Sequence, residues 1–330
     1  MRIYYFFICI LIFSCTPHDE NKFSLNGKMQ AEGNGKVLYL IDAQSGRALD
    51  STIIEDGRFE FNTKLPETPI FVKLKTKYNF LYTELWLDNN AMVFDAKNKS
   101  FSQAAIHGSK AQAQSEKLTA QVDTLPRSER NEVLQNFIFE NNDNLLGVVT
   151  LYHWFINWGK ERTEPVYNTL SDANRNTVYG KEIDHFLTLN TNPDVGDQYV
   201  DVSLRNPEGE TKKISEFMGK TVLLEFWSTT CAPCRKDNVH LVGEYEKYSN
   251  KKFEIISVAI DTDLEEWKAG IEEDHLKWIN LSDLNGYRGD VAFIYGIKLL
   301  PSNYLINEEG KIIARNLRGD ELTETLRKVL

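Results

Sequence analysis

The sequence predicts an α/β fold for the C-terminal part of the chain, preceded by a small all-β sandwich-like domain and a helical segment. Short apolar runs separated by turn residues fill the first part, which is typical of a sandwich or barrel. Apolar residues at helical spacing follow. In the last part, apolar runs alternate with helical patterns, which predicts a mixed sheet covered by helices. A chain of 330 residues is also too long for one hydrophobic core.

These patterns predict where the domains begin and end. We expect a signal peptide over residues 1–14, a β-rich N-terminal domain over 22–108, a helical linker domain over 109–190, and the α/β domain over 191–330. The polar run Asn190-Thr191-Asn192-Pro193 reads as the linker before the last domain.

The N-terminus has the pattern of an export signal. Arg2 precedes an apolar run, residues 3–13, that is too short to span a bilayer. Ser14-Cys15 and a polar stretch follow, as in bacterial lipoprotein signals. We expect Cys15 to be lipidated and to anchor the protein to a membrane. The alternative is an ordinary signal peptide with an unrelated cysteine.

The β-rich domain shows turn signals every few residues. The clearest is Glu55-Asp56-Gly57, where glycine can adopt a positive φ. No nucleophile–base pair is visible in this domain, so a hydrolase site is not expected. Strands are expected over residues 36–42, 51–54, 58–61, 70–74, 80–87 and 91–94.

The helical segment carries an aromatic cluster. Helices are expected over residues 128–140, 145–158, 164–170 and 177–189. Tyr152, Trp154, Phe155 and Trp158 pack the helices together in the simpler interpretation, and line a ligand pocket in the alternative.

The α/β domain begins with its most apolar strand. The near-continuous apolar run over residues 221–227 predicts a strand that is covered on both faces. Helices are then expected over 234–248, 264–274, 289–295 and 321–330, and strands over 253–260, 301–307 and 311–316.

Two cysteines follow this strand at the start of the next helix. The chain has four cysteines; Cys9 would leave with the signal peptide and Cys15 would carry lipid, so Cys231 and Cys234 remain as thiols. A single pair excludes a disulfide-stapled scaffold. Structural zinc requires four ligands and only His240 lies near the pair, so no metal site is expected. A dithiol at a strand–helix junction is suited to thiol–disulfide exchange, with the pair itself as the redox-active disulfide and no further cofactor.

Charge excludes one class of partner. The net charge is −10 at pH 7, whereas binding to phosphate backbones requires a basic surface. We therefore expect no nucleic-acid partner.

Residues from about 193 to 330 resemble the thioredoxin superfamily, and within it the TlpA/ResA type. The resemblance is carried by Phe226-Trp227, by Cys231-Ala232-Pro233-Cys234-Arg235, by the segment 295–310 around Leu300-Pro301, and by the stretch between Asp261 and Ile294, which matches an insertion of that branch. The β-rich part resembles a domain of no assigned activity that precedes such modules in lipoproteins of Gram-negative bacteria, on residues 49–52 and 56–61.

The two sulfurs are expected to have different roles. Cys231 lies at a helix N-terminus, where backbone N–H groups and the helix dipole favour the thiolate, so it is the expected attacking sulfur. Cys234 is the expected resolving sulfur. Ala232-Pro233 adds no charge between them, which favours a potential nearer thioredoxin's about −270 mV than DsbA's about −120 mV.

The resemblance implies further site residues. It places Glu225 at thioredoxin's buried acid, where burial would raise its pKa and let it exchange a proton with Cys234; a surface glutamate is the alternative. Pro301 resembles the cis-proline opposite the dithiol, and Leu300 backbone groups would pair with an extended substrate. An ordinary trans proline is the alternative. Trp227 is expected beside the active site, as part of substrate binding. Thr230 stands where many members carry tryptophan, so substrate preference does not carry over.

Together these features predict a membrane-anchored thiol:disulfide oxidoreductase, most consistent with a reductase of protein disulfides. The resemblance implies a lipid-anchored protein facing the periplasm of a Gram-negative bacterium, in the inner or outer membrane. Its partners would be disulfide-containing clients, with apocytochrome c and hence cytochrome c maturation as one case by family analogy. An upstream membrane electron donor is also required, because the chain lacks a nucleotide-binding Gly-rich loop.

Two other functions stay open at this level. One is a peroxiredoxin-like antioxidant peroxidase, which the domain resembles distantly. The other is a surface binding module with an accessory redox domain.

Overall fold

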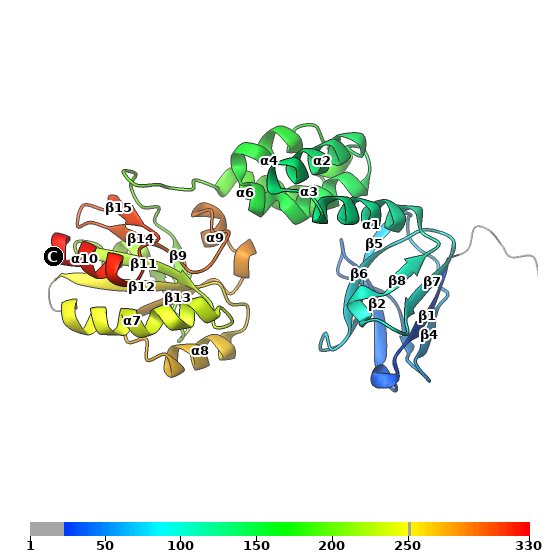
Figure 1. Ribbon diagram of the computed structural model, residues 1–330, viewed down its shortest axis with the longest axis horizontal. Helices are drawn as coiled ribbons and strands as arrows, with labels where there is room; N and C mark the ends of the chain where they lie inside the picture. Colours follow the sequence, from blue (N-terminus) through cyan, green and yellow to red (C-terminus); the bar gives the residue numbers. More distant parts are fainter. Residues whose placement is uncertain (1–22, 250–251) are drawn as a thin grey trace, which may run out of the picture. The chain divides into compact units, whose positions relative to one another are not determined.

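The computed structural model describes residues 23–249 and 252–330, so the expected signal peptide and Cys15 lie outside the described residues. The chain, drawn in Figure 1, divides into two compact units. The boundary lies between Leu146 and Gly147. The helical residues 109–190 are therefore shared between the two units. Among the described residues, no helix has both the length and the apolar character needed to cross a bilayer.

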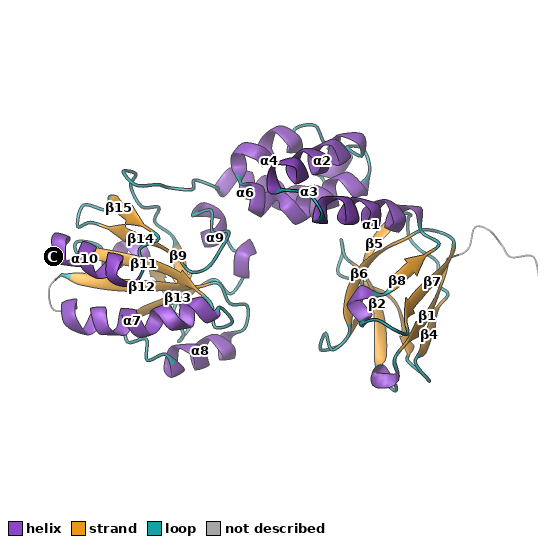
Figure 2. Cartoon of the chain, viewed as in Figure 1, coloured by secondary structure: helices purple, strands orange, loops and turns teal. Residues whose placement is uncertain are grey.

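The first unit is built on two four-stranded sheets, ordered β4-β1-β7-β8 and β3-β2-β5-β6 (Figure 2). Buried side chains of both sheets, such as Leu25, Leu38, Phe61 and Leu74, form one core, which confirms the sandwich-like β-rich region. The strands are β1 (Ser24–Met29), β2 (Val37–Asp42), β3 (Ala48–Ile53), β4 (Arg58–Phe61), β5 (Ile70–Thr76), β6 (Tyr82–Leu87), β7 (Ala91–Ala96) and β8 (Ala105–His107).

The turn expected after β3 is present. Asp56 and Gly57 have φ angles of 48° and 66°, and Glu55 pairs with Arg58 across them. Positive φ at both central residues is the geometry of a tight two-residue turn. A Cβ atom at Gly57 would lie 2.4 Å from the Met29 carbonyl oxygen, so the turn requires glycine.

Two long helices close the first unit, α1 (Lys110–Asp123) and α2 (Arg127–Glu140). Asp88, which follows β6, accepts hydrogen bonds from the Ser109 hydroxyl and from the Lys110 and Ala111 amides. A carboxylate at this position stabilises the N-terminus of α1 and fixes the helix to the end of the sheet.

Four helices open the second unit and pack onto the α/β domain. Phe155 contacts Phe186 and Phe293, with ring centroids 5.0 and 5.8 Å apart. Arg288 lies over the Tyr152 ring at 3.9 Å and pairs with Glu182. These aromatic side chains pack between helices, as the simpler interpretation predicts. The helices are α3 (Leu145–Trp158), α4 (Lys160–Tyr167), α5 (Asp172–Arg175) and α6 (Val178–Leu189).

The rest of the second unit is a seven-stranded mixed sheet, ordered β10-β9-β13-β12-β11-β14-β15. Strand β11 lies inside the sheet, parallel to β12 and antiparallel to β14. The strands are β9 (Ser203–Arg205), β10 (Thr211–Lys213), β11 (Thr221–Trp227), β12 (Phe253–Ala259), β13 (Ile279–Ser282), β14 (Ser302–Ile306) and β15 (Ile312–Arg315). The helices are α7 (Ala232–Tyr248), α8 (Leu264–Glu273), α9 (Asp290–Ile294) and α10 (Gly319–Val329).

Side chains alternate along β11 between two cores, one on each face of the sheet. Val222, Leu224 and Phe226 join the core that contains residues of α9. Leu223 and Trp227 join the core that contains residues of α7, α8 and α10. By this alternation Glu225 belongs to the face covered by α7 and α10.

The sequence analysis did not predict five of the described strands: β1, β8, β9, β10 and β13. Strands β9 and β10 have three residues each and are mostly polar, so no alternation is visible in them. Their position depends on pairing with each other and, for β9, with β13. The buried strand over 221–227 has the predicted bounds.

Candidate active site

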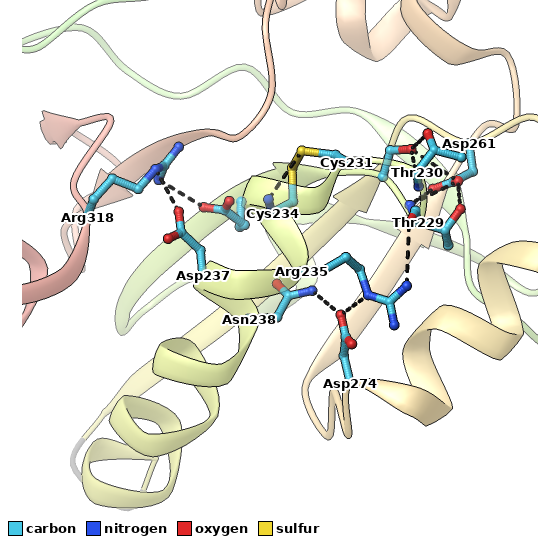
Figure 3. The surroundings of a disulfide bond; sticks show 12 residues. Thr229, Thr230, Cys231, Cys234, Arg235, Asp237, Asn238, Asp261, Asp274 and Arg318 are labelled. Atoms are coloured by element: carbon cyan, nitrogen blue, oxygen red, sulfur yellow. Dashed lines mark hydrogen bonds and ion pairs between the residues drawn. A yellow bond between two sulfur atoms is a disulfide. The ribbon is translucent and has the colours of Figure 1, made fainter.

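Cys231 and Cys234 form a disulfide at the start of α7 (Figure 3). All seven residues of β11 are buried, and the chain leaves the sheet through Ser228, Thr229 and Thr230 before the helix begins. Cys231 is the N-cap of α7, and its Sγ accepts a hydrogen bond of 3.2 Å from the Cys234 amide. Cys231 is partly exposed, whereas Cys234 is fully buried. Only the first sulfur is therefore accessible to a large partner.

A buried carboxylate fixes the loop before Cys231. Asp261, two residues after β12, is 6% exposed. It accepts hydrogen bonds from the Thr229 amide and hydroxyl and from the Ser228 hydroxyl. The Thr230 hydroxyl lies 3.0 Å from the Ser228 hydroxyl. Polar contacts thus hold this loop.

Arg235, next to Cys234, is held away from the sulfurs. It pairs with Asp274 and Glu273 at the end of α8, and it donates to the Thr229 carbonyl oxygen. Asn238 donates a second hydrogen bond to Asp274 (Figure 3). The network ties α7 to α8, and its two carboxylates neutralise the guanidinium.

Glu225 is 1% exposed, so the surface-facing alternative is wrong. Burial raises the pKa of Glu225 to about 8, against the lowering effects of Arg318 and of a hydrogen bond from Asn303; Asp237 raises it further. Arg318 Nη1 lies 3.7 Å from Glu225 Oε2, and Arg318 Nε lies 3.0 Å from Asp237 Oδ2. The predicted proton exchange with Cys234 stays a prediction.

The peptide bond between Leu300 and Pro301 is cis, as the resemblance predicted. Both residues are partly buried at the start of β14, and the preceding Leu299 is 78% exposed. Their role in docking a substrate stays a prediction.

Trp227 is fully buried and shares a core with Cys234. In this structure its side chain is not accessible to a client, so any effect on substrate binding acts through packing. Its indole Nε1 has no hydrogen-bond partner among the described residues.

Sequence reasoning missed Asp237, Asp261, Asp274 and Arg318. Each is a charged residue that no local pattern distinguishes from its neighbours. Among residues 23–249 and 252–330, no cluster of His, Cys, Asp and Glu could hold a metal ion.

Comparison with known proteins agrees with this geometry. Residues 195–315 match the AhpC/TSA family, and residues 23–114 match a domain of unknown function, DUF4369. The thiol-disulfide oxidoreductase ResA of Halalkalibacterium halodurans is 34% identical over 125 residues, which cover 38% of this chain and 69% of the relative. The chain belongs to the ResA-like thiol-disulfide oxidoreductases. ResA of Bacillus cereus is 30% identical over 137 residues, covering 42% of this chain and 77% of the relative.

Solved structures that are similar to this chain include the thioredoxin domain of a thiol-disulfide oxidoreductase from Bacteroides vulgatus. It is 34% identical, with a TM-score of 0.40, and the match covers 42% of this chain and 99% of that one. The C-terminal domain is a thioredoxin fold, and the protein is a thiol-disulfide oxidoreductase.

The buried Glu225 predicts an unusual pH dependence of stability. Its pKa is about 8 in the folded protein and about 4.3 in an unfolded chain. Between these values the folded state keeps a proton that the unfolded state releases, so the free energy of unfolding falls as pH rises. E225Q removes this loss of stability. In urea titrations of the oxidised proteins, the free energy of unfolding of E225Q should exceed that of wild type by about 2–4 kcal/mol at pH 8. At pH 4.5 the difference should be less than about 1 kcal/mol.

The matched control for this prediction is E246Q, because Glu246 lies on α7 with an exposed side chain. It should leave the difference between the two pH values unchanged. Equal stability of E225Q and wild type at pH 8 would contradict a pKa of about 8.

Proposed function

We propose that this protein is a membrane-anchored, periplasm-facing oxidoreductase that reduces disulfides in client proteins through Cys231 and Cys234. The observation that carries the proposal is the asymmetry of the pair: Cys231 is partly exposed at a helix N-terminus and Cys234 is fully buried one turn later. An exposed sulfur can attack a client, and a buried one can only resolve the bond that results.

The exchange balances in two steps. In the reduced protein, the Cys231 thiolate attacks one sulfur of the client disulfide, and the other client sulfur leaves as a thiolate. Cys234 then attacks Cys231, which forms the internal disulfide and releases the second client thiol. Two electrons pass from the protein to the client, so an upstream membrane electron donor must reduce the pair again. No nucleic acid takes part, in line with the net charge of −10.

The direction of electron flow predicts the redox potential. Because Ala232-Pro233 adds no charge between the sulfurs, equilibration with glutathione should give a potential nearer thioredoxin's about −270 mV than DsbA's about −120 mV. The reduced protein should also reduce insulin much faster than it consumes hydrogen peroxide. A potential above about −160 mV would contradict a reductase, and faster peroxide turnover would favour the peroxidase that the AhpC/TSA match leaves open.

The assignment of the two sulfurs predicts which variant retains clients. In C234A the resolving sulfur is missing, so Cys231 should stay joined to its client. Cell-envelope extracts should then give adducts on non-reducing gels that dithiothreitol releases, and mass spectrometry would identify the client. C231A is the control and should retain none. Adducts that C231A forms equally would contradict the assigned roles, and a surface binding module would retain clients without a disulfide.

The lipid anchor predicts the chemistry of the mature N-terminus. Lipoprotein processing would begin the mature protein at Cys15, with acyl chains that attach it to the inner or outer membrane. Mass spectrometry of the purified protein should therefore find a lipid-modified Cys15 as its first residue. An unmodified N-terminus at or beyond residue 15 would contradict the anchor.

A further inference from the structure

Arg318 lies between two carboxylates on the α7 side of the sheet. Its Nη1 is 3.7 Å from Glu225 Oε2. Its Nε is 3.0 Å from Asp237 Oδ2, a pair drawn in Figure 3. We propose that Arg318 is a positioning residue for the second step of the exchange: it holds the Glu225 carboxylate as the acceptor of the Cys234 proton and joins it to Asp237 at the surface. The inference rests on the dithiol exchange proposed above.

The backbone fixes the position of Arg318 before α10. Asn303 binds both backbone groups of Leu317: its Nδ2 donates to the carbonyl oxygen at 2.9 Å, and its Oδ1 accepts from the amide at 3.0 Å. Asn303 is also the residue of β14 that pairs with Glu225. The segment that carries Arg318 is therefore clamped to the strand beside Glu225.

The surroundings of Glu225 hold few charges. Its pairing partners on β12 and β14 are the neutral Ser257 and Asn303. Helix α7 supplies Asp237 and the titratable His240, and the segment before α10 supplies Arg318. Among these groups, within the described residues, Arg318 is thus the one permanently charged cation.

The same groups surround a route to solvent. A cavity of about 10 Å³ is lined by Glu225, Asp237, His240 and Arg318, together with apolar side chains. This is close to the volume that one water molecule needs. Glu225 Oε2 has no hydrogen-bond partner among the described residues, whereas Asp237 and Arg318 are each 30% exposed at the side chain. Protons can therefore leave Glu225 on this side of the sheet.

In the second step, the Glu225 carboxylate takes the proton from Cys234 Sγ. The Cys234 thiolate then attacks Cys231 Sγ in the mixed disulfide. The bond between Cys231 and Cys234 forms, and the bond from Cys231 to the client breaks. The client sulfur leaves with the electron pair and takes a proton from solvent. Glu225 afterwards returns its own proton to solvent beside Asp237.

The two neighbours of Glu225 have opposite effects on it. Arg318 lowers the pKa of Glu225 and Asp237 raises it. Removing the charge of Arg318 should therefore raise the pH midpoint of the second step, and removing the charge of Asp237 should lower it. A purely structural role of Arg318 would change rates or stability without this reversal of sign.

The test uses the full reduced protein and the aromatic disulfide 5,5′-dithiobis(2-nitrobenzoate) in stopped flow. The first attack and the resolving step each release one coloured thiolate, so their rates are separate phases. In R318Q the midpoint of the second phase should rise by about one pH unit, and in D237N it should fall. R318K keeps the charge and should restore most of the wild-type midpoint. The first phase should keep its pH profile in all three.

Three further variants make the result specific. E225Q should abolish the midpoint, because the proton acceptor is gone. R315Q is the matched control: Arg315 belongs to β15 and pairs with Asp194. H240Q tests whether the imidazole of His240 is the source of the midpoint. R315Q and H240Q should each leave the pH midpoint of the second phase unchanged.

Shifts of R318Q and D237N in the same direction, or a shift in R318Q no larger than in R315Q, would overturn the role of Arg318. Absence of a second phase in the wild type would instead contradict the exchange reaction itself. The two failures are therefore distinguishable.

Discussion

The burial of one ionisable carboxylate is the constraint on which the site depends. Glu225 is enclosed in a strand whose seven residues are all buried, so bulk water stabilises its charge only weakly. An isolated carboxylate in such a place costs several kcal/mol, and an apolar residue would fit the strand better. The chain supplies only partial compensation, from Arg318 at 3.7 Å and from Asn303. A cost of this kind is typical of functional sites, where a raised pKa is useful.

The alternation of side chains along β11 explains why Glu225 lies on the same side of the sheet as the helix that begins at the dithiol. Residues 223, 225 and 227 share one face, and that face is covered by the helix that begins at the dithiol. A shift of one residue in register would move Glu225 to the opposite core, beside α9. The parallel pairing with β12 and the antiparallel pairing with β14 fix this register on both sides. The sheet therefore places Glu225 on the side covered by α7, the helix that begins at the dithiol.

Local patterns in the sequence predicted the strand, the helix and the dithiol between them, because each depends on neighbouring residues. They also predicted the cis bond before Pro301 through the resemblance to a family. They could not predict Asp261, Asp274 or Arg318, since these contacts join segments far apart in the chain. A charged residue in a surface pattern carries no sign of its distant partner. Short strands such as β9 were missed for the same reason: only pairing defines them.

Two arginines, Arg235 within α7 and Arg318 just before α10, differ in effect because their surroundings differ. Arg235 follows Cys234 directly, but Asp274 and Glu273 neutralise it, so it adds little positive potential at the sulfurs. The Cys231 thiolate must then be stabilised chiefly by the amides at the start of α7, of which Cys234 N already donates to Cys231 Sγ. Arg318 instead forms ion pairs with the buried Glu225 and with Asp237. In the proposed mechanism the helix N-terminus therefore acts on the first sulfur, and Glu225 with its ion pair to Arg318 acts on the second.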